Sequence, residues 1–251
     1  MTNATLETEL KTHLEHFYEL YKKGKDMYCS ILGVHDKELD EWSFSKFWDY
    51  QEALKKASGL CVALSEHRGF VRMRSMFHEQ RKNARFYINS HDEETVMEIV
   101  AGICSRLNGS YSFQIKTIGP HNYGFARYDN TILYVNMPAN LRHIADALKE
   151  MPENLFDEET PFAAKKISKG ICYAFSPPSC PRVVLGKPLD CWKYPFNDLH
   201  AKVLETTFEV CKEKNITDLD EMAGLYAQAL EDARFDPENP HLWLGLPDPI
   251  T

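Results

Sequence analysis

A lysine, a histidine and an arginine follow one another in the middle of the chain. His121 comes five residues after Lys116, and Arg127 comes eleven residues after it. Lys116 lies in the stretch YSFQIKTI (residues 111–118), where polar and apolar residues alternate as in a half-buried strand. A lysine at such a position is either an ordinary solvated side chain or a base, which needs a pKa lowered by burial and nearby cations. The spacing alone leaves both interpretations open.

Further cations flank the neighbouring segments. Arg85 opens the stretch RFYINS, in which Tyr87 and Asn89 follow it at every second position. Arg127 precedes the stretch TILYVN. Guanidinium groups bind phosphate oxygens through paired hydrogen bonds. More cations occur later in this otherwise acidic chain: Lys165, Lys166, Lys169, Arg182, Lys187 and Lys193. Each of them alone is most simply a solvated side chain, but together these cations favour a phosphate pocket.

Other kinds of site have little support in the sequence. No His-Glu-x-x-His motif occurs, and His13 and His16 are predicted to be a surface feature of a helix. A Ser-His-Asp or Cys-His triad stays open, although there is no Gly-x-Ser-x-Gly elbow. The absence of a Gly-x-x-x-x-Gly-Lys loop argues against an NTPase or a kinase. We therefore expect no metal and no other cofactor.

Composition limits the partners. A formal charge of −8 and a pI near 5.7 argue against a general nucleic-acid binder, which must neutralise phosphates. No apolar run approaches the roughly 20 residues of a membrane span, and the polar N-terminus predicts no secretory signal. The seven cysteines are scattered without a Cys-x-x-Cys pair, which predicts neither a zinc site nor a disulfide framework. We expect a reducing, cytoplasmic environment.

The elements that must position the candidate residues are clearest in the centre of the chain. Alternating patterns predict strands at residues 85–90, 111–118 and 131–136. Asp92 is predicted to cap a helix whose apolar residues recur at helical spacing, and Pro138 to open another. This β-α-β-β-α order predicts an α+β fold, with a small mixed or antiparallel sheet packed against helices.

The flanking regions are predicted to be mainly helical. Residues 6–21 and 40–57 are expected to form helices. The stretch GFVRMRSMFHEQ is ambiguous, and its alternation over residues 70–76 also fits a strand. Residues 170–175 are expected to form a short strand, and CPRVVLGKPLDCWKYPF (residues 180–196) an irregular basic loop.

Two further helices and a tail are expected near the C-terminus. One helix is predicted to be capped by Asn197 or Asp198 and the next to start at Thr217, with Leu242 and Trp243 docking the Pro-rich tail. No convincing linker occurs. We therefore expect one domain over residues 1–251, with a mainly helical region (1–80), a β-α-β-β-α core (81–150), and a basic loop region with C-terminal helices (151–251).

Several motifs resemble the HopA-type family, which includes a type III secreted effector of plant-pathogenic bacteria and stand-alone proteins of peptide natural-product gene clusters. The central pattern is Arg-x-Tyr-x-Asn, an apolar helix, Phe-x-x-Lys, Arg-x-Asp and Leu-Tyr. It is matched here by Arg85, Tyr87, Asn89, Phe113, Lys116, Arg127, Asp129, Leu133 and Tyr134. TPFAAKKISKG resembles a later family segment and supplies Lys165 or Lys166. The family's Gly-x-Ser-Phe-Gly-x-x-Arg motif survives only as GKPLDCWK, where Lys193 replaces the arginine.

The strand–helix–strand order is also distantly similar to that of phosphothreonine lyases. That resemblance implies Lys116 as the general base and Tyr87 or His121 as the acid. It implies phosphate binding by Arg85, Asn89, Arg127, Lys165 and Lys193. The implied activity is phosphate β-elimination from phosphoserine or phosphothreonine in a peptide or protein, which leaves dehydroalanine or dehydrobutyrine.

Two other functions stay open. The degraded GKPLDCWK segment favours a non-catalytic module that binds a peptide or partner protein, such as a partner kinase in a biosynthetic pathway or a host protein for an effector. An effector would act inside a host cell rather than in the cytoplasm where it is made. The third interpretation is a non-catalytic globular protein whose basic loop is merely surface.

Overall fold

The computed structural model describes residues 3–32, 44–58, 70–75, 84–107, 110–118, 127–135, 140–177 and 181–250. They fall into two compact units, each of which is described by itself. Unit 1 comprises Met1–Leu32 and Pro177–Pro247, and unit 2 comprises Gly33–Ser176 and Asp248–Thr251. Both units are discontinuous in sequence, so neither is bounded by a single linker that composition would reveal. The expectation of one domain stays a prediction.

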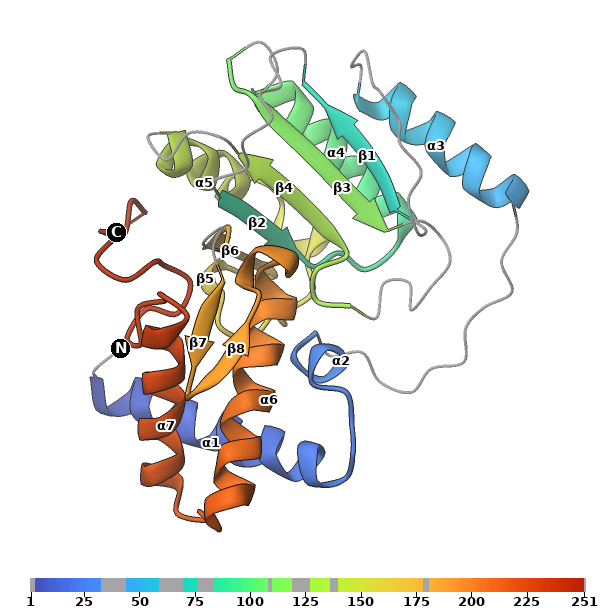
Figure 1. Ribbon diagram of the computed structural model, residues 1–251. Helices are drawn as coiled ribbons and strands as arrows, with labels where there is room; N and C mark the ends of the chain where they lie inside the picture. The colour runs from blue at the N-terminus through green and yellow to red at the C-terminus, as the bar shows by residue number, and fades with distance from the viewer. Residues whose placement is uncertain are drawn as a thin grey trace. The chain divides into compact units, whose positions relative to one another are not determined.

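Unit 2 is built on a six-stranded sheet with the strand order β1-β3-β4-β2-β6-β5 (Figure 1). All neighbouring strands run antiparallel, which confirms the predicted α+β fold. The strands are β1 (Phe70–Arg74), β2 (Ala84–Ile88), β3 (Phe113–Ile118), β4 (Thr131–Val135), β5 (Lys165–Ser168) and β6 (Ile171–Phe175). The ambiguous segment at residues 70–76 thus forms an edge strand, and β5 is a strand that the sequence did not predict.

The register separates two faces of this sheet, because directly opposed residues of antiparallel strands point the same way. Leu133 of β4 lies opposite Ile115 of β3 and Phe86 of β2, and these residues form the centre of an apolar face. Helix α4 runs behind β1 and β3 in Figure 1. Every residue of β2 and β4 is buried, so both faces of these strands are covered.

The helices of unit 2 are α3 (Phe44–Ser58), α4 (Glu93–Leu107), α5 (Leu141–Lys149) and the short 3-10 helix η3 (Glu153–Leu155). The predicted cap of α4 is confirmed: Asp92 Oδ1 accepts a hydrogen bond from the Thr95 amide at 2.9 Å. Two acidic residues in the first turn of α4 complement its dipole. Its buried residues repeat at helical spacing: Val96, Ile99, Val100, Ile103, Cys104 and Leu107.

Unit 1 combines both ends of the chain. Its helices are α1 (Asn3–Lys22), α2 (Met27–Ile31), α6 (Phe196–Lys214) and α7 (Leu219–Asp232), with the 3-10 helix η4 (Cys191–Lys193). Its strands are β7 (Arg182–Val184) and β8 (Lys187–Leu189), which form a separate two-stranded sheet. The predicted N-terminal and C-terminal helices are therefore confirmed.

The expectation of an irregular loop at residues 180–196 was wrong, since much of this segment is the β7–β8 hairpin. Its turn residues, Leu185 and Gly186, have φ angles of 48° and 80°. A two-residue turn with positive φ at both positions matches the twist of a hairpin. Leucine rarely adopts this conformation, but its amide donates to Asp232 Oδ2 at 2.8 Å, which holds the turn. The Leu-Gly pair lacks the usual Asn-Gly signature, so the sequence did not reveal it.

The start of α6 differs from the prediction. Pro195 occupies the cap position and α6 begins at Phe196, so Asn197 and Asp198 lie inside the first turn. Proline presets the backbone angle of a helix start, and an acidic residue in the first turn stabilises it electrically. For α7, the prediction of a start at Thr217 was close: Asp218 is the cap, and its side chain accepts from two backbone amides at 3.0 Å.

The tail is anchored at two points. Leu242 is buried as predicted, whereas Trp243 is 37% exposed, so only one of the two expected docking residues is confirmed. Farther along, Asp248 accepts from Lys165 Nζ at 2.5 Å and from the Tyr173 hydroxyl, which ties it to β5 and β6. Burial alone would raise the pKa of Asp248, but these donors hold it below its usual range.

Candidate active site

The second face of the sheet in unit 2 carries polar side chains in two rows. The register places Lys116 of β3 between Arg72 of β1 and Ile132 of β4, and Ile132 lies opposite Tyr87 of β2. Two residues along the strands, a second row contains Arg74, Gln114, Tyr134 and Arg85. We call these residues the polar face: Arg72, Arg74, Arg85, Tyr87, Gln114, Lys116 and Tyr134. The face therefore gathers four cations on three strands.

Lys116 is partly buried among these cations. Burial lowers the pKa of Lys116 to about 8, and the guanidinium groups of Arg72, Arg127 and Arg85 act in the same direction. The carboxylate of Asp129 opposes them. At pH 7 roughly a tenth of such an amine is neutral, compared with less than about one in a thousand for an ordinary lysine. The surroundings predicted for a catalytic lysine are thus present.

Arg85 and Tyr87 alternate on β2 and are both buried. The guanidinium carbon of Arg85 lies 5.3 Å from the centre of the Tyr134 ring, and its Nη2 donates to Ser176 Oγ at 3.2 Å. This stacking fixes the guanidinium plane. Burial raises the pKa of Tyr87 well above its usual value, so its hydroxyl stays protonated. Tyr87 is therefore better suited to hydrogen bonding than to releasing a proton.

Arg127 lies just before β4 and is held by a carboxylate. Its Nε donates to Asp129 Oδ1 at 2.8 Å and its Nη2 to Asp129 Oδ2 at 3.0 Å, and Asp129 is 2% exposed. Such a paired contact occupies one edge of the guanidinium group. Asp129 belongs to the motif that carried the family resemblance, but its contact with Arg127 was not predicted.

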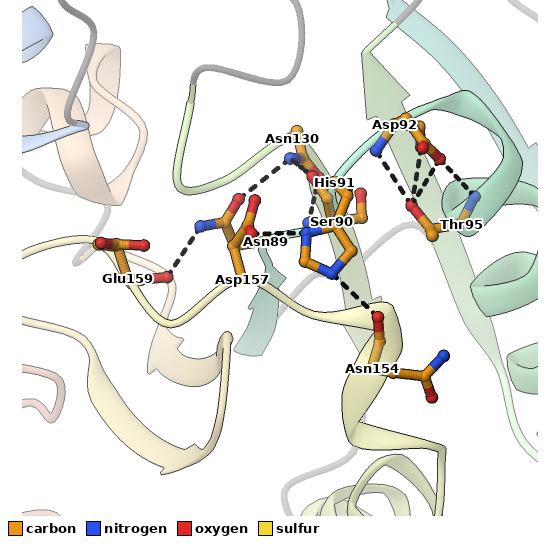
Figure 2. Close-up of polar contacts among 9 residues, drawn as sticks. All are labelled: Asn89, Ser90, His91, Asp92, Thr95, Asn130, Asn154, Asp157 and Glu159. Carbon is orange, nitrogen blue, oxygen red and sulfur yellow. Dashed lines mark hydrogen bonds and ion pairs between the residues drawn. The ribbon is translucent and has the colours of Figure 1, made fainter.

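Asn89 belongs to a buried network at the end of β2 (Figure 2). Its Nδ2 donates to the Glu159 carbonyl at 3.1 Å, and its Oδ1 accepts from Asn130 Nδ2 at 3.2 Å. Asn130 also binds the backbone and the hydroxyl of Ser90. Both polar atoms of the Asn89 amide are therefore engaged with protein. Asn89 therefore joins the end of β2 to neighbouring segments, and its binding of phosphate stays a prediction.

The same network explains a glycine of the resembling TPFAAKKISKG segment. Gly170 turns the chain between β5 and β6 with a φ of 59°. Its carbonyl oxygen accepts a hydrogen bond from the backbone N–H of Asn89 at 2.8 Å. A Cβ there would lie 2.3 Å from the carbonyl oxygen of Asp157, which is too close for any side chain. Nearby, His91 lies against Asp157 Oδ1 at 2.5 Å (Figure 2). Glycine is needed here for close packing rather than for ligand binding.

Two predicted phosphate ligands do not lie on the polar face. Lys165 lies opposite Tyr173 in the register, and the amine of Lys165 binds Asp248. The ring centroids of Tyr173 and Phe86 are 6.0 Å apart, which places Tyr173 on the apolar face. Lys193 lies in η4 of unit 1, where it forms an ion pair with Asp190. Lys165 therefore lies on the other face of the sheet from Lys116, and phosphate binding by Lys193 stays a prediction. Successive residues of a strand point to opposite faces, so Lys166, and not Lys165, lies on the side of Cys172 and Tyr87.

His121 lies outside the described residues. Among the residues that are described, no group of three or more His, Cys, Asp or Glu side chains could hold a metal ion. Within that same part of the chain, no helix is long and apolar enough to cross a membrane.

The sequence analysis missed three residues of the polar face. Arg72 and Arg74 were not singled out because residues 70–76 fitted more than one structure. Gln114 carries no charge and was given no role, although the pattern in YSFQIKTI assigns it to the same side of the strand as Lys116. The signal that might have identified all three is the alternation in FVRMR and FQIK, which assigns them to one side of adjacent strands.

Comparisons with known proteins place this chain in a wider group. The model of the HopA1 effector protein family matches residues 63–186, a segment that includes every residue of the polar face. An effector protein from Pseudomonas syringae pv. tomato strain DC3000 has a similar structure, with 16% identity and a TM-score of 0.64, covering 95% of this chain and 99% of that one. An effector protein from Pseudomonas syringae pv. syringae strain 61 matches with 19% identity and a TM-score of 0.63, covering 96% and 98%. At these identities the likeness shows the fold alone. No curated protein matches the chain.

Proposed function

The chain belongs to the HopA-type family, and on this premise we propose that it removes phosphate from phosphothreonine or phosphoserine in a protein by β-elimination. One observation carries the proposal: Lys116 is partly buried beside guanidinium groups, and its pKa is about 8. A lysine in such surroundings is a competent base near neutral pH. A surface lysine held by carboxylates would not be.

The reaction assigns the role of base to Lys116. Neutral Lys116 takes the Cα proton of the phosphorylated residue and becomes an ammonium. The electrons of the C–H bond form the Cα–Cβ double bond, and those of the Cβ–O bond leave with the phosphate. A proton on the departing oxygen, supplied by the substrate monoanion or by an acid, yields hydrogen phosphate and a dehydroamino acid. No step of this scheme calls for a redox cofactor.

The cations of the polar face would neutralise the leaving phosphate. Arg72 lies directly opposite Lys116, Arg85 belongs to the adjacent row of the polar face, and Arg127 is held by Asp129 just before β4. Fixed cations that meet a developing negative charge lower the barrier more than flexible ones do. The same groups disfavour the ammonium form of Lys116, so they support both substrate binding and the base.

Tyr87 and His121 are the two candidates for the acid. The pKa of Tyr87 is raised well above its usual value, so Tyr87 is proposed to donate a hydrogen bond to phosphate while His121 supplies the proton. Because proton donation to a leaving group contributes typically 100-fold to 10,000-fold, His121→Gln would separate these roles by slowing the reaction without weakening phosphate binding.

The partner is proposed from the relatives. The two matched structures are of effector proteins from Pseudomonas syringae strains, so a protein of a host cell is the proposed substrate. A biosynthetic peptide phosphorylated by a partner kinase is the corresponding substrate for a role in natural-product formation. Both present the same phosphorylated side chain to Lys116.

A second candidate function is binding of a phosphorylated protein without chemistry. The observation that favours it is the engagement of Arg127 by Asp129, together with the raised pKa of Tyr87, because both reduce the groups available for catalysis. A binding module would still use the cations of the polar face, but it would not need a neutral Lys116.

One experiment distinguishes the two functions. The protein is incubated with phosphothreonine peptides, and the products are weighed by mass spectrometry. Loss of a whole phosphoric acid, abolished in Lys116→Ala, supports elimination. Loss of phosphate with retention of the hydroxyl indicates a phosphatase, and unchanged mass with measurable peptide affinity indicates a binding module.

A further inference from the structure

Gln114 is the most unusual polar residue of the sheet. It is 1% exposed, and neither its Nε2 nor its Oε1 has a hydrogen-bond partner in the part of the chain that the structure describes. The buried Nε of Arg74, directly opposite Gln114 in the register, also lacks a partner there. An unsatisfied buried amide costs about 1–3 kcal/mol, so a protein has reason to keep one only where something else satisfies it.

We propose that Gln114 and Arg74 bind the main-chain N–H and C=O of a substrate residue next to the phosphorylated residue. The inference rests on the proposed function and makes it more specific, since it defines a peptide subsite beside Lys116. It accounts for residues to which the elimination mechanism gives no role.

The atoms at this subsite select the ligand. Gln114 presents a donor, Nε2, and an acceptor, Oε1, and Arg74 adds a donor. A second phosphate or carboxylate would satisfy the donors but leave the Gln114 oxygen buried without a partner. In an extended chain the N–H and C=O of one residue point to the same side, so together they pair with both ends of the carboxamide, and the carbonyl oxygen also accepts from the guanidinium. The set therefore fits main chain better than it fits an anion.

The spacing along β3 agrees with this arrangement. Gln114 and Lys116 are two residues apart on one strand, so their positions differ by about 7 Å. An extended substrate chain advances by the same distance over two residues. The main-chain N–H and C=O of a residue one or two positions from the phosphorylated residue therefore reach Gln114 while the Cα proton faces Lys116.

The test removes one peptide N–H at a time. The probe is a blocked pentapeptide with phosphothreonine at its centre and two alanines on each side. In a series of analogues, one peptide bond after another is replaced by an ester, which lacks the N–H. Affinities are measured by calorimetry in the Lys116→Ala background so that the peptide is not consumed, with and without the additional change Gln114→Met.

The expected result is a coupling between one bond and Gln114. With Gln114 present, one ester analogue binds about fivefold more weakly than the parent peptide, whereas with Gln114→Met the two bind alike. Ester analogues that weaken equally in both proteins overturn the inference, as does the absence of any pentapeptide binding at millimolar concentration. A Gln51→Met control changes another buried glutamine, on α3, and is expected to leave the whole series unchanged.

A stability measurement excludes a purely structural role. Methionine has a similar length and no unsatisfied polar atoms, so Gln114→Met is expected to keep or slightly raise the melting temperature while binding weakens. A fall of several degrees would overturn the inference, because it would show that the amide supports the fold. The outcome is separable from that of the proposed function: elimination can proceed while the ester series ignores Gln114, and the coupling can appear in a protein that performs no elimination.

Discussion

The lysines of unit 1 and Lys116 of unit 2 have opposite surroundings. Lys187 lies 2.8 Å from Glu209 and 2.9 Å from Glu213, and Lys193 pairs with Asp190. These carboxylates raise the pKa of both lysines, whereas burial and neighbouring cations lower that of Lys116. The comparison shows that a cluster of lysines in the sequence says little about a phosphate site. Burial and the sign of the neighbouring charges decide.

The buried amides of unit 2 differ in the same way. Asn130 bonds to Asn89 and to Ser90, so its polar atoms are used within the fold. Gln114 is equally buried, but its amide has no partner in the described residues. Satisfied amides hold strands together, and an unsatisfied one in a charged face is suited to a ligand.

The largest expected effect separates Lys116 from Lys193. Lys116→Ala should lower the elimination rate by about 100-fold to 10,000-fold, because a general base contributes that much. Lys193→Ala removes an exposed lysine paired with Asp190 and should leave the rate within about twofold. Both rates are measured from the dehydroamino acid formed on a phosphothreonine peptide. An equal loss of elimination rate in the two variants would contradict the assignment of the base to Lys116 alone.

The second prediction concerns the two amides. Asn130→Ala should lower the free energy of unfolding by about 2–4 kcal/mol, since it leaves groups of Asn89 and Ser90 buried without partners. Gln114→Met, the matched variant, should lower it by much less or raise it. Urea denaturation measures both changes. A larger loss in Gln114→Met would contradict the assignment of Gln114 to ligand binding.

A third prediction concerns a titratable residue that serves packing rather than chemistry. His200 of α6 is fully buried between the rings of Phe196 and Phe235, at 4.4 and 4.5 Å between centroids, and burial lowers its pKa to about 3. Below pH 6.5 the unfolded chain binds a proton that the folded chain does not. The free energy of unfolding should therefore fall with decreasing pH, by at most about 1.4 kcal/mol per unit, down to pH 3.

The variant His200→Leu isolates this contribution. Its unfolding free energy should depend less on pH between 6.5 and 3, while elimination by unit 2 stays unchanged at pH 7. Urea denaturation at a series of pH values gives the slope for each protein. Identical slopes would mean that His200 is already protonated in the folded state.

The smallest expected effect tunes Lys116 through its neighbours. Arg72→Met removes a cation and should raise the pKa of Lys116, which lowers the rate at pH 7 by about twofold. Asp129→Asn removes the opposing carboxylate and should lower that pKa. The midpoint of the pH–rate profile should thus move in opposite directions in the two variants. Movement in the same direction would show that another group controls the profile.

The sequence predicted the fold better than the site. Periodicity located β2, α4, β3, β4 and α5, because burial of one side imposes a regular spacing on the residues. The β7–β8 turn escaped because Leu185 adopts its conformation through a contact with Asp232, which is distant in the sequence. Local sequence patterns do not indicate such long-range contacts.

For the site, the alternation on β2 and β3 correctly placed Arg85, Tyr87 and Lys116 on one face. It did not reveal that Lys165 points to the other face, because β5 was not recognised as a strand. It also did not reveal that Asn89 is held by Asn130, since that bond joins residues far apart in the chain. Strand membership and long-range partners are the information that residue types lack.

The most direct test of the central claim is the pKa of Lys116 itself. Lysine amines are labelled with carbon-13 by reductive methylation, and the signal missing from Lys116→Ala is followed by NMR as the pH rises. We predict that the titration midpoint of Lys116 lies near pH 8, well below the midpoints of the other lysines. A midpoint at the ordinary value of about 10.4 would contradict it, because Lys116 would then be an ammonium at neutral pH and no base for the elimination.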